Sequence, residues 1–170
     1  MKDIVRNQEN LVYFDNKIFK KLIKLAENSD LLRSRICIHT NNNARTNEMI
    51  IALKKGSYIR PHIHPEKKSE SYHLIKGKMT VFVFDKKGNL IKKIKMGEAG
   101  TSLNFYYRMS KGYYHMPVAT SKFCIYHETY SGPFNKKRDV IFPKWSPNSN
   151  DKKKYLNFLK KHKLTKYFND

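Results

Sequence analysis

The chain has 170 residues, with 35 Lys or Arg against 14 Asp or Glu, and so carries a formal net charge of +21. A chain of that length is expected to form one domain with a substantial core. Its positive charge is compatible with three kinds of partner: nucleic acid, an anionic membrane surface or an anionic substrate. The lysines are scattered, and the clusters at 92–95 and 151–155 are too short for nucleic-acid arms. We therefore expect a solvated basic surface and no nucleic-acid partner. Because no apolar run reaches about 18 residues, we expect no membrane insertion and a cytoplasmic location.

The first predicted element is a helix over residues 15–30, where apolar side chains recur on one face and Asp15 or Asn16 can cap the start. From residue 32 to residue 134 the pattern changes to short runs rich in β-branched and aromatic residues, separated by turn-forming stretches. After these runs a loop leads to a second helix, predicted from the apolar stripe within 151–168.

The order of these elements predicts a single domain over 1–170, with an N-terminal helical segment (1–31), a β-barrel (32–134) and a C-terminal loop and helix (135–170). Many short strands without helical crossovers favour an all-β sandwich or barrel over a parallel α/β sheet. Cys37 and Cys124 lie within apolar strand-like runs, so we expect them to be buried free thiols.

Four residues form a candidate metal site. His62 and His64 are separated by one residue, and residues i and i+2 of a strand project to the same face. Glu70 follows at the start of the next predicted strand, and His115 comes much later, after a Ser-Lys-Gly turn. Three imidazoles and a carboxylate suit one divalent transition metal, namely Fe, Zn, Mn or Ni, with positions left for substrate or water. The alternative is a surface turn rich in His and Glu.

The glycines around these residues carry a family resemblance. The order Gly56, His62, His64, Glu70, Gly77 resembles the first motif of the cupin superfamily, Gly-x5-His-x-His…Glu-x6-Gly. Five residues separate the second histidine from Glu70, where three or four are usual, and this makes Glu66 a competing ligand. The spacing to the final glycine favours Glu70.

The second cupin motif is matched less closely. The stretch "SKGYYH" keeps the Gly and His115, but has Ser110 for the usual proline, and Ala119 stands for the usual asparagine. The resemblance implies an all-β fold, a cupin-type double-stranded β-helix (jelly-roll barrel) with an N-terminal helix and a C-terminal helical arm. It also implies metal binding by the four residues above.

The stretches "RSRICIHTN", "YIRPHIHP" and "YHETYSGPF" narrow the resemblance to the WbuC-type cupin-fold metalloproteins, over nearly the whole chain. That family is associated with bacterial surface-polysaccharide (O-antigen, lipopolysaccharide) gene clusters, and its reaction is not established. The resemblance implies a metal site and this pathway, and from both we expect a metal-dependent isomerase or epimerase acting on an anionic sugar or sugar nucleotide. The alternatives are an iron-dependent dioxygenase, a non-enzymatic metal-dependent sugar-binding cupin, and a metal-free epimerase in which His works with Tyr or Asp.

Arg35 and His39 share a strand face, on which Arg35 could bind a phosphate or carboxylate and His39 could shuttle a proton. Equally, this segment can be an edge strand whose Arg35 and His39 side chains simply face solvent. Arg60 and Arg108 are further candidates for substrate binding. Glu128 is a candidate general base, against the simpler reading of an ion pair with one of many lysines.

Two other histidines, His73 and His127, fall on the strand faces opposite Glu70 and Glu128, so we interpret them as structural. Barrels with edge strands and flanking arms often pair, and we therefore also consider a homodimer.

Overall fold

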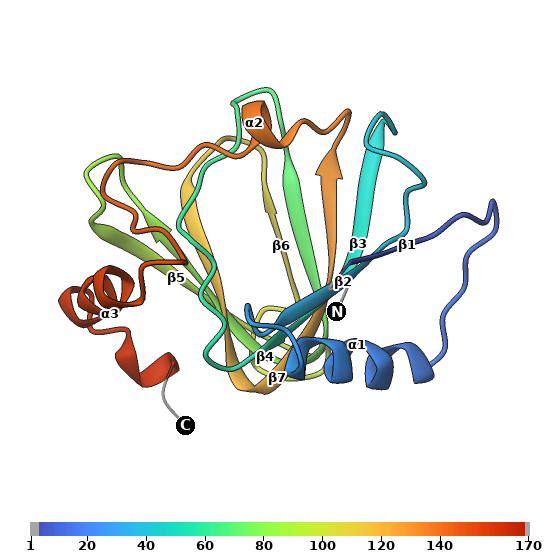
Figure 1. The fold of residues 1–170 in the computed structure, drawn as a ribbon, viewed down its shortest axis with the longest axis horizontal. Coiled ribbons are helices and arrows are strands. Elements are labelled where there is room, and N and C mark those ends of the chain that lie inside the picture. The colour runs from blue at the N-terminus through green and yellow to red at the C-terminus, as the bar shows by residue number, and fades with distance from the viewer. Residues whose placement is uncertain (1–3, 169–170) are drawn as a thin grey trace.

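The computed structural model describes residues 4–168, and its elements follow one another as in Figure 1. The helices are α1 (Lys17–Glu27), α2 (Lys136–Asp139), α3 (Lys152–Lys161) and the 3-10 turn η1 (Thr165–Tyr167). The strands are β1 (Ile4–Arg6), β2 (Arg33–Cys37), β3 (Thr46–Lys54), β4 (Glu70–Phe84), β5 (Leu90–Gly97), β6 (Tyr106–Met109) and β7 (Tyr114–Ser131).

These strands form one sheet in the order β1-β2-β3-β7-β4-β5, with β6 added beside β4. Only the β1–β2 pair is parallel, and the other pairs are antiparallel. The long strands β4 and β7 pair along nearly their whole length, from Glu70 opposite Tyr130 to Phe84 opposite Tyr114. In Figure 1 this ribbon bends sharply, so that its two halves face each other and enclose the interior.

Gly77 lies at this bend, close to two irregularities in the β4–β7 register. Its φ of +82° is a conformation that side-chain-bearing residues rarely adopt. A Cβ built there would overlap the carbonyl oxygen of Phe123 on the paired strand. The bend therefore needs a residue without a side chain.

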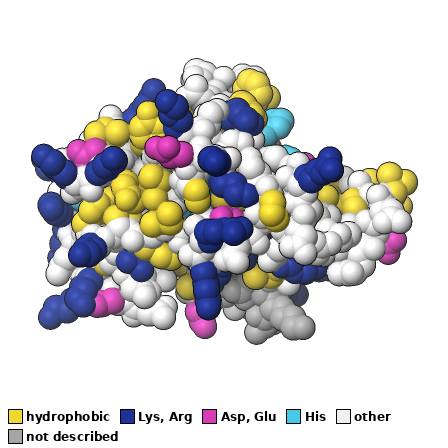
Figure 2. Space-filling model, turned by 90° about the horizontal axis from the view of Figure 1, so that it is seen from above, with side chains coloured by type: hydrophobic (Ala, Val, Ile, Leu, Met, Phe, Trp, Pro, Cys, Tyr) yellow, Lys and Arg dark blue, Asp and Glu magenta, His cyan; other side chains and the backbone are white. Residues whose placement is uncertain are grey.

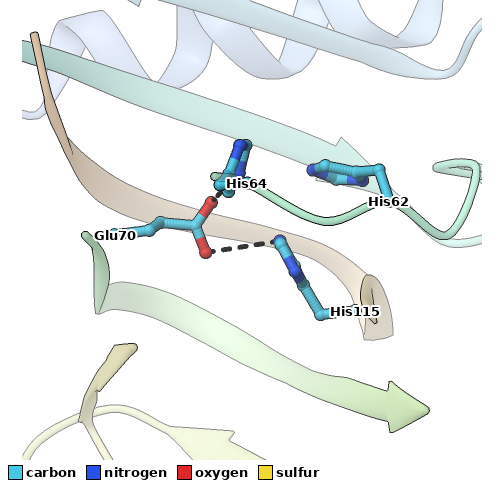
Figure 3. Close-up of side chains that lie close together, drawn as sticks. All are labelled: His62, His64, Glu70 and His115. Carbon is cyan, nitrogen blue, oxygen red and sulfur yellow. Dashed lines mark hydrogen bonds and ion pairs between the residues drawn. The ribbon is translucent and has the colours of Figure 1, made fainter. Parts of the chain in front are cut away.

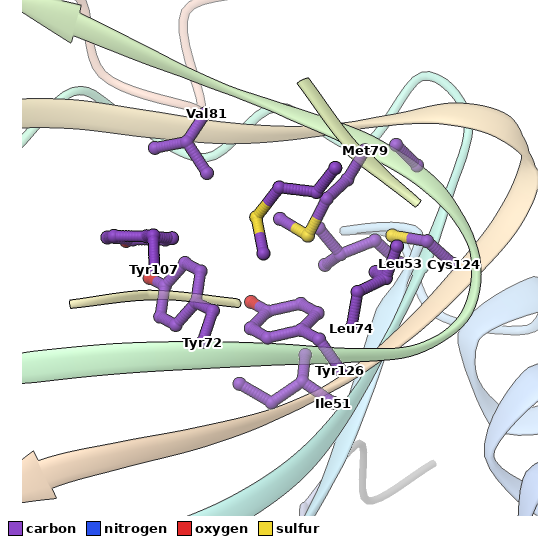
Figure 4. Close-up of a cluster of buried hydrophobic side chains, with 11 residues drawn as sticks. Ile51, Leu53, Tyr72, Leu74, Met79, Val81, Tyr107, Cys124 and Tyr126 are labelled. Atoms are coloured by element: carbon purple, nitrogen blue, oxygen red, sulfur yellow. The ribbon is translucent and has the colours of Figure 1, made fainter. Parts of the chain in front are cut away.

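The interior of the bent sheet is filled by one hydrophobic cluster (Figure 4). Its buried members are Ile51, Leu53, Tyr72, Leu74, Met79, Val81, Met96, Tyr107, Ala119, Cys124 and Tyr126. These side chains come from both halves of the ribbon and from β3, β5 and β6, so the same core that stabilises the fold also fixes its curvature. Cys37 and Cys124 are buried and free, as predicted.

The helices cover the outside of the sheet. Leu22 and Ala26 of α1 pack on the outer face of β2 and β3, against Ile36 and Ile50. The C-terminal arm packs Phe158 and Leu159 of α3 against β4 and β7 at the other end of the sheet, on the left in Figure 1. Both helices thus bury one apolar stripe, as an amphipathic pattern predicts.

The structure refines the boundaries expected from the sequence. The first helix is shorter than 15–30, and the C-terminal helix ends at Lys161 before a separate 3-10 turn. The predicted loop after residue 134 contains α2, whose start is capped by Asn135 accepting from the amides of Lys137 and Arg138. Within residues 4–168, no helix combines the length and apolar character needed to span a bilayer. Basic side chains are spread over the face seen in Figure 2 among hydrophobic ones.

Candidate metal centre

His62 and His64 lie in the segment that crosses the open side of the bent sheet. His62 and His115 exchange two main-chain hydrogen bonds, 3.2 and 2.8 Å long, and Ile63 forms a second isolated bridge with Ile141. We expected a regular strand here, and the structure has isolated bridges instead. Pro61 and Pro65 explain the difference, because proline has no N–H to extend the ladder on either side.

The other two residues come from opposite ends of the β4–β7 ribbon. Glu70 begins β4, whereas His115 is the second residue of β7 and pairs with Val83 near the end of β4. The bend brings them together, with His115 Nε2 3.4 Å from Glu70 Oε1. His64 Nε2 lies 3.1 Å from Glu70 Oε2, and Figure 3 shows the His62 ring beside both other imidazoles.

The four side chains form one compact cluster in which each offers a ligand atom, and all of these atoms lie within 4.8 Å of one another. Glu70 and His115 are almost fully buried, with 3% and 0% of their surface exposed. Glu66, the competing carboxylate, is exposed and outside the cluster.

The hydrogen bonds of the histidines fix which nitrogen faces the centre. Each Nδ1 lies against a main-chain carbonyl oxygen: that of Arg60 for His62 (2.9 Å), Asp139 for His64 (2.6 Å) and Tyr113 for His115 (2.9 Å). A carbonyl oxygen only accepts, so each Nδ1 carries the hydrogen. In the neutral rings, all three Nε2 lone pairs are therefore left to face the cluster, an arrangement that metal-binding histidines share.

The four groups shift one another's pKa values, and they hold His62 and Glu70 in the neutral and ionised forms that bind a metal. Burial, together with the neighbouring His115 and His64, holds the pKa of His62 well below its ordinary value, so this ring is neutral at pH 7. Burial alone would raise the pKa of Glu70, but the adjacent His115 and His64 outweigh it and hold that pKa well below its usual range. Burial likewise lowers the pKa of His64, and Glu70 outweighs it and raises that pKa.

The donor set therefore fits a metal ion. His115 Nε2 is buried and has no hydrogen-bond partner among residues 4–168. An imidazole lone pair facing a carboxylate is repulsive unless a cation or a proton lies between them. Three imidazole nitrogens with one carboxylate are ligands that suit Fe, Zn, Mn or Ni.

A pair of tyrosines and a second carboxylate adjoin the cluster. Tyr107 donates its hydroxyl to Glu70 Oε1 at 2.8 Å, and Tyr72 lies directly opposite Glu128 on the paired strand. Burial and the charge of Glu70 raise the pKa of Glu128 to about 8, against the opposing effects of His64 and Arg35. Glu128 is thus a half-buried carboxyl group within electrostatic reach of two of the candidate ligands.

The remaining candidates lie at different distances from this centre. His39 is placed beside the main chain of Glu48, whose amide lies 3.0 Å from Nδ1, and is not part of the cluster. Arg60 stacks its guanidinium 4.4 Å from the ring centre of Phe142, which itself lies 6.2 Å from the ring of His62. Arg60 therefore lies at the outer edge of the centre.

Arg108 lies on the outside of the sheet. Arg108 lies opposite Ser71 on β4 and donates to Ser69 Oγ at 3.0 Å. It directly follows the inward-facing Tyr107 on β6, so its side chain points outward. His73 and His127 are paired with each other on the same outer face, and His127 Nε2 is 3.3 Å from Glu48 Oε1. Arg35 is exposed on the interior side of β2, opposite Ile51.

Sequence reasoning did not single out Tyr107, Tyr72 or Tyr130. The ring centre of Tyr130 lies 4.7 Å from that of His64, and its buried hydroxyl has no hydrogen-bond partner in the part of the chain that the structure describes. Tyr130 and Tyr72 each lie two residues after a candidate carboxylate, Glu128 or Glu70, on the same strand. Side chains two residues apart on a strand share a face, so this spacing could have indicated both tyrosines. Tyr107 gave no such signal, because its direction follows only from the pairing of β6 with β4.

Comparison with known proteins gives a fold but no established function. A family model described as a domain of unknown function (DUF6016) matches residues 14–96, just under half of the chain, and includes His62, His64 and Glu70 but not His115. No curated protein matches the chain.

The solved structures that resemble the chain include oxalate oxidase in complex with the substrate analogue glycolate. The TM-score is 0.51 at 12% identity, over 67% of this chain and 56% of that one. A tryptophan-to-phenylalanine variant of oxalate decarboxylase from B. subtilis gives 0.45 at 18% identity, over 58% of this chain and 24% of that one. A protein from Shewanella oneidensis gives 0.49 at 12% identity, over 73% and 72%.

The chain thus spans about half of the oxalate oxidase and a quarter of the decarboxylase. At these identities the likeness concerns the fold alone. The fold is the all-β cupin barrel that the sequence motifs predict.

Proposed function

We propose that this cupin-fold protein binds one divalent transition metal, Fe, Zn, Mn or Ni, through His62, His64, Glu70 and His115. The observation that carries the proposal is the convergence of three Nε2 atoms, each set by an Nδ1–H bond to the main chain, on one buried carboxylate. Four protein ligands leave further positions open in a five- or six-coordinate site, where a small molecule can bind.

Elemental analysis of protein purified without a metal-affinity tag tests this proposal. We expect about one equivalent of metal, lost in the His62→Ala/His64→Ala double variant. The matched control is His73→Ala/His127→Ala, which removes two imidazoles from the outer face of the sheet. Absence of metal after reloading with several divalent ions, or equal loss in both double variants, contradicts the proposal.

The reaction that we propose is the isomerisation or epimerisation of an anionic sugar or sugar nucleotide, in cytoplasmic synthesis of a bacterial surface polysaccharide such as O-antigen. The support for this pathway is the resemblance to WbuC-type cupins. The support for the chemistry is Glu128, a half-buried carboxyl group beside the centre that can take or give a proton. A bound metal would supply Lewis acidity toward a carbonyl or enediolate oxygen.

In this reaction Glu128 moves the proton, with Tyr72 directly opposite it on the paired strand. Tyr107 holds Glu70 in place through its hydroxyl. His39 lies outside the cluster, beside the main chain of Glu48, so it would act as a proton shuttle only through intervening groups. Arg60, at the outer edge of the centre, and Arg35, which acts electrostatically on Glu128, are the proposed substrate-binding cations. Arg108, on the outside of the sheet, is the least favourably placed.

Incubating metal-loaded protein in deuterated water with a panel of sugar phosphates and nucleotide sugars tests the reaction. We expect deuterium to enter one carbon position of the turned-over compound, and Glu128→Gln to abolish this exchange while metal content stays unchanged. Oxygen uptake by the iron-loaded protein would favour the dioxygenase instead. Tight binding with the ligand recovered unchanged would favour a sugar-binding cupin.

A further inference from the structure

One row of paired residues crosses six strands of the sheet and ends at the candidate metal centre. Each member lies directly opposite the next on the neighbouring strand, so all of the side chains point to the same face. From edge to centre the row is Arg6, Cys37, Met49, Glu128, Tyr72 and Tyr107. Since Tyr72 and Tyr107 belong to the interior cluster and Met49 packs against it, this face is the interior one.

The inner end of the row connects to the metal ligands. Tyr107 donates to Glu70. Tyr72, whose ring centre is 4.9 Å from that of Tyr107, lies directly opposite Glu128 on the paired strand. The two tyrosines thus lie between two carboxyl groups on the same face of the sheet. Glu70 is buried in the cluster, whereas Glu128 keeps contact with solvent. A ligand atom bound next to the cluster would therefore meet Glu128 first.

The outer end of the row is cationic. Arg6 and Arg35 are exposed, and Arg35 lies two residues before Cys37 on the same strand face. Arg6 lies directly opposite Cys37 on the neighbouring strand, so Arg6 and Arg35 are diagonal neighbours on this face of the sheet. Arg6 donates to the neutral Asn42 at 3.0 Å. Within residues 4–168, neither arginine forms an ion pair with a carboxylate.

The spacing between the two ends sets the size of a ligand that could use both. Neighbouring strands lie about 4.8 Å apart, so Arg35 on β2 is roughly 10 Å and Arg6 on β1 roughly 14 Å from the strand that carries Glu128. The arginine side chains shorten both spans. Such a distance corresponds to a monosaccharide that carries an anionic group at the end opposite its metal-bound oxygens.

We propose that this row binds a hydroxylated ligand with a terminal phosphate or carboxylate group, Glu128 contacting a hydroxyl of the metal-bound end and Arg35 with Arg6 binding the anion. This inference rests on the proposed metal site and adds to it a class of ligand and an anion-binding residue, Arg6, from the edge strand. Guanidinium groups suit this role because their planar donors match phosphate and carboxylate oxygens.

Calorimetric titration of the metal-loaded full chain tests the inference, with hexose 6-phosphates, the parent hexoses and inorganic phosphate as probes. We expect at least one phosphorylated hexose to bind at least tenfold more tightly than its parent. The Arg6→Gln/Arg35→Gln variant should lose that tenfold preference. Lys92→Gln/Lys93→Gln, which removes two exposed charges from β5, should change it by less than twofold.

A second pair of variants tests the inner end. Glu128→Gln should weaken binding of both the phosphorylated and the parent hexose, whereas Glu48→Gln, a carboxylate on the outer face, should not. Metal content measured on every variant separates the two proposals. If the protein has its full metal content but shows no preference for phosphorylated probes, or binds none of them, the inference is overturned. The proposed metal site is then unaffected. Lack of metal in the wild-type protein overturns the proposed function itself.

Discussion

The hydroxyl of Tyr107 donates to Oε1 of Glu70 across 2.8 Å, in the same buried space where His115 Nε2 approaches that oxygen. The two residues come from the paired strands β6 and β4, which fixes their relative position. This hydrogen bond orients the carboxylate toward the histidines.

Replacement of Tyr107 by Phe should therefore weaken metal binding by about 10- to 100-fold, as is typical for the loss of a partner of a metal ligand. Competition with a chromophoric chelator measures the change. Tyr106→Phe is the matched control, because this neighbour points to the outer face and is 46% exposed. An affinity unchanged by Tyr107→Phe would show that the hydroxyl does not support the metal ligand.

Metal binding should stabilise the fold, because its ligands come from three separate segments of the chain. At a free metal concentration of 100 times Kd the gain is about 2.7 kcal/mol. For a chain of this size that free energy raises Tm by roughly 5–10 °C. Differential scanning calorimetry with and without metal measures it. The His62→Ala/His64→Ala variant should show no metal-dependent shift, and a shift of equal size there would place the binding elsewhere.

The bend in β4 should depend on Gly77, for which a Cβ would overlap the Phe123 carbonyl and lie 2.8 Å from Ser121 Oγ. Gly77→Ala should lower the free energy of unfolding by about 3 kcal/mol or more, from backbone strain and overlap combined. Gly100→Ala is the control, since Gly100 has a φ of +87° with nothing within 4 Å of a Cβ. It should cost only about 1 kcal/mol. Urea unfolding measures both variants. An equal decrease in the free energy of unfolding for Gly77→Ala and Gly100→Ala would contradict a cost from the overlap with Phe123.

Glu128 should make the stability of the metal-free protein depend on pH. Its pKa is about 8 in the folded state, above the ordinary value of 4.5, so the folded protein retains a proton that the unfolded chain has lost. Stability therefore falls as pH rises between these two values, by at most about 1.4 kcal/mol per pH unit for this group. Glu128→Gln, which cannot ionise, should show a smaller fall between pH 5 and about 8 in urea unfolding. Parallel curves for the two proteins would contradict the raised pKa.

The cluster of three histidines and Glu70 could be predicted from the sequence because the spacing of His62 and His64 reflects local geometry. Two histidines with one residue between them project together wherever the backbone is extended, even though His62 and His64 lie in isolated bridges. The opposite direction of His73 and His127 follows from the same alternation along a strand, and the register confirms it. The choice of Glu70 over Glu66 came from a family spacing, and the structure places only Glu70 in the cluster.

What could not be predicted depends on contacts between distant segments. Tyr107 reaches Glu70 only because β6 pairs with β4, and Arg6 joins the interior face only because β1 pairs with β2. Neither short strand has a pattern strong enough to predict its partner. The close approach of His115 to Glu70 needs the bend of the β4–β7 ribbon, which the sequence signals only through Gly77.

The central claim is that three imidazoles and one carboxylate bind a single metal ion, and X-ray absorption at the edge of the bound metal tests it most directly. We expect the multiple scattering of about three imidazole rings, with nitrogen and oxygen neighbours at roughly 2.0–2.2 Å. The imidazole signal should fall by about two rings in any metal that remains with the His62→Ala/His64→Ala variant. A first shell of oxygen without imidazole scattering, or sulfur at about 2.3 Å, would contradict the account.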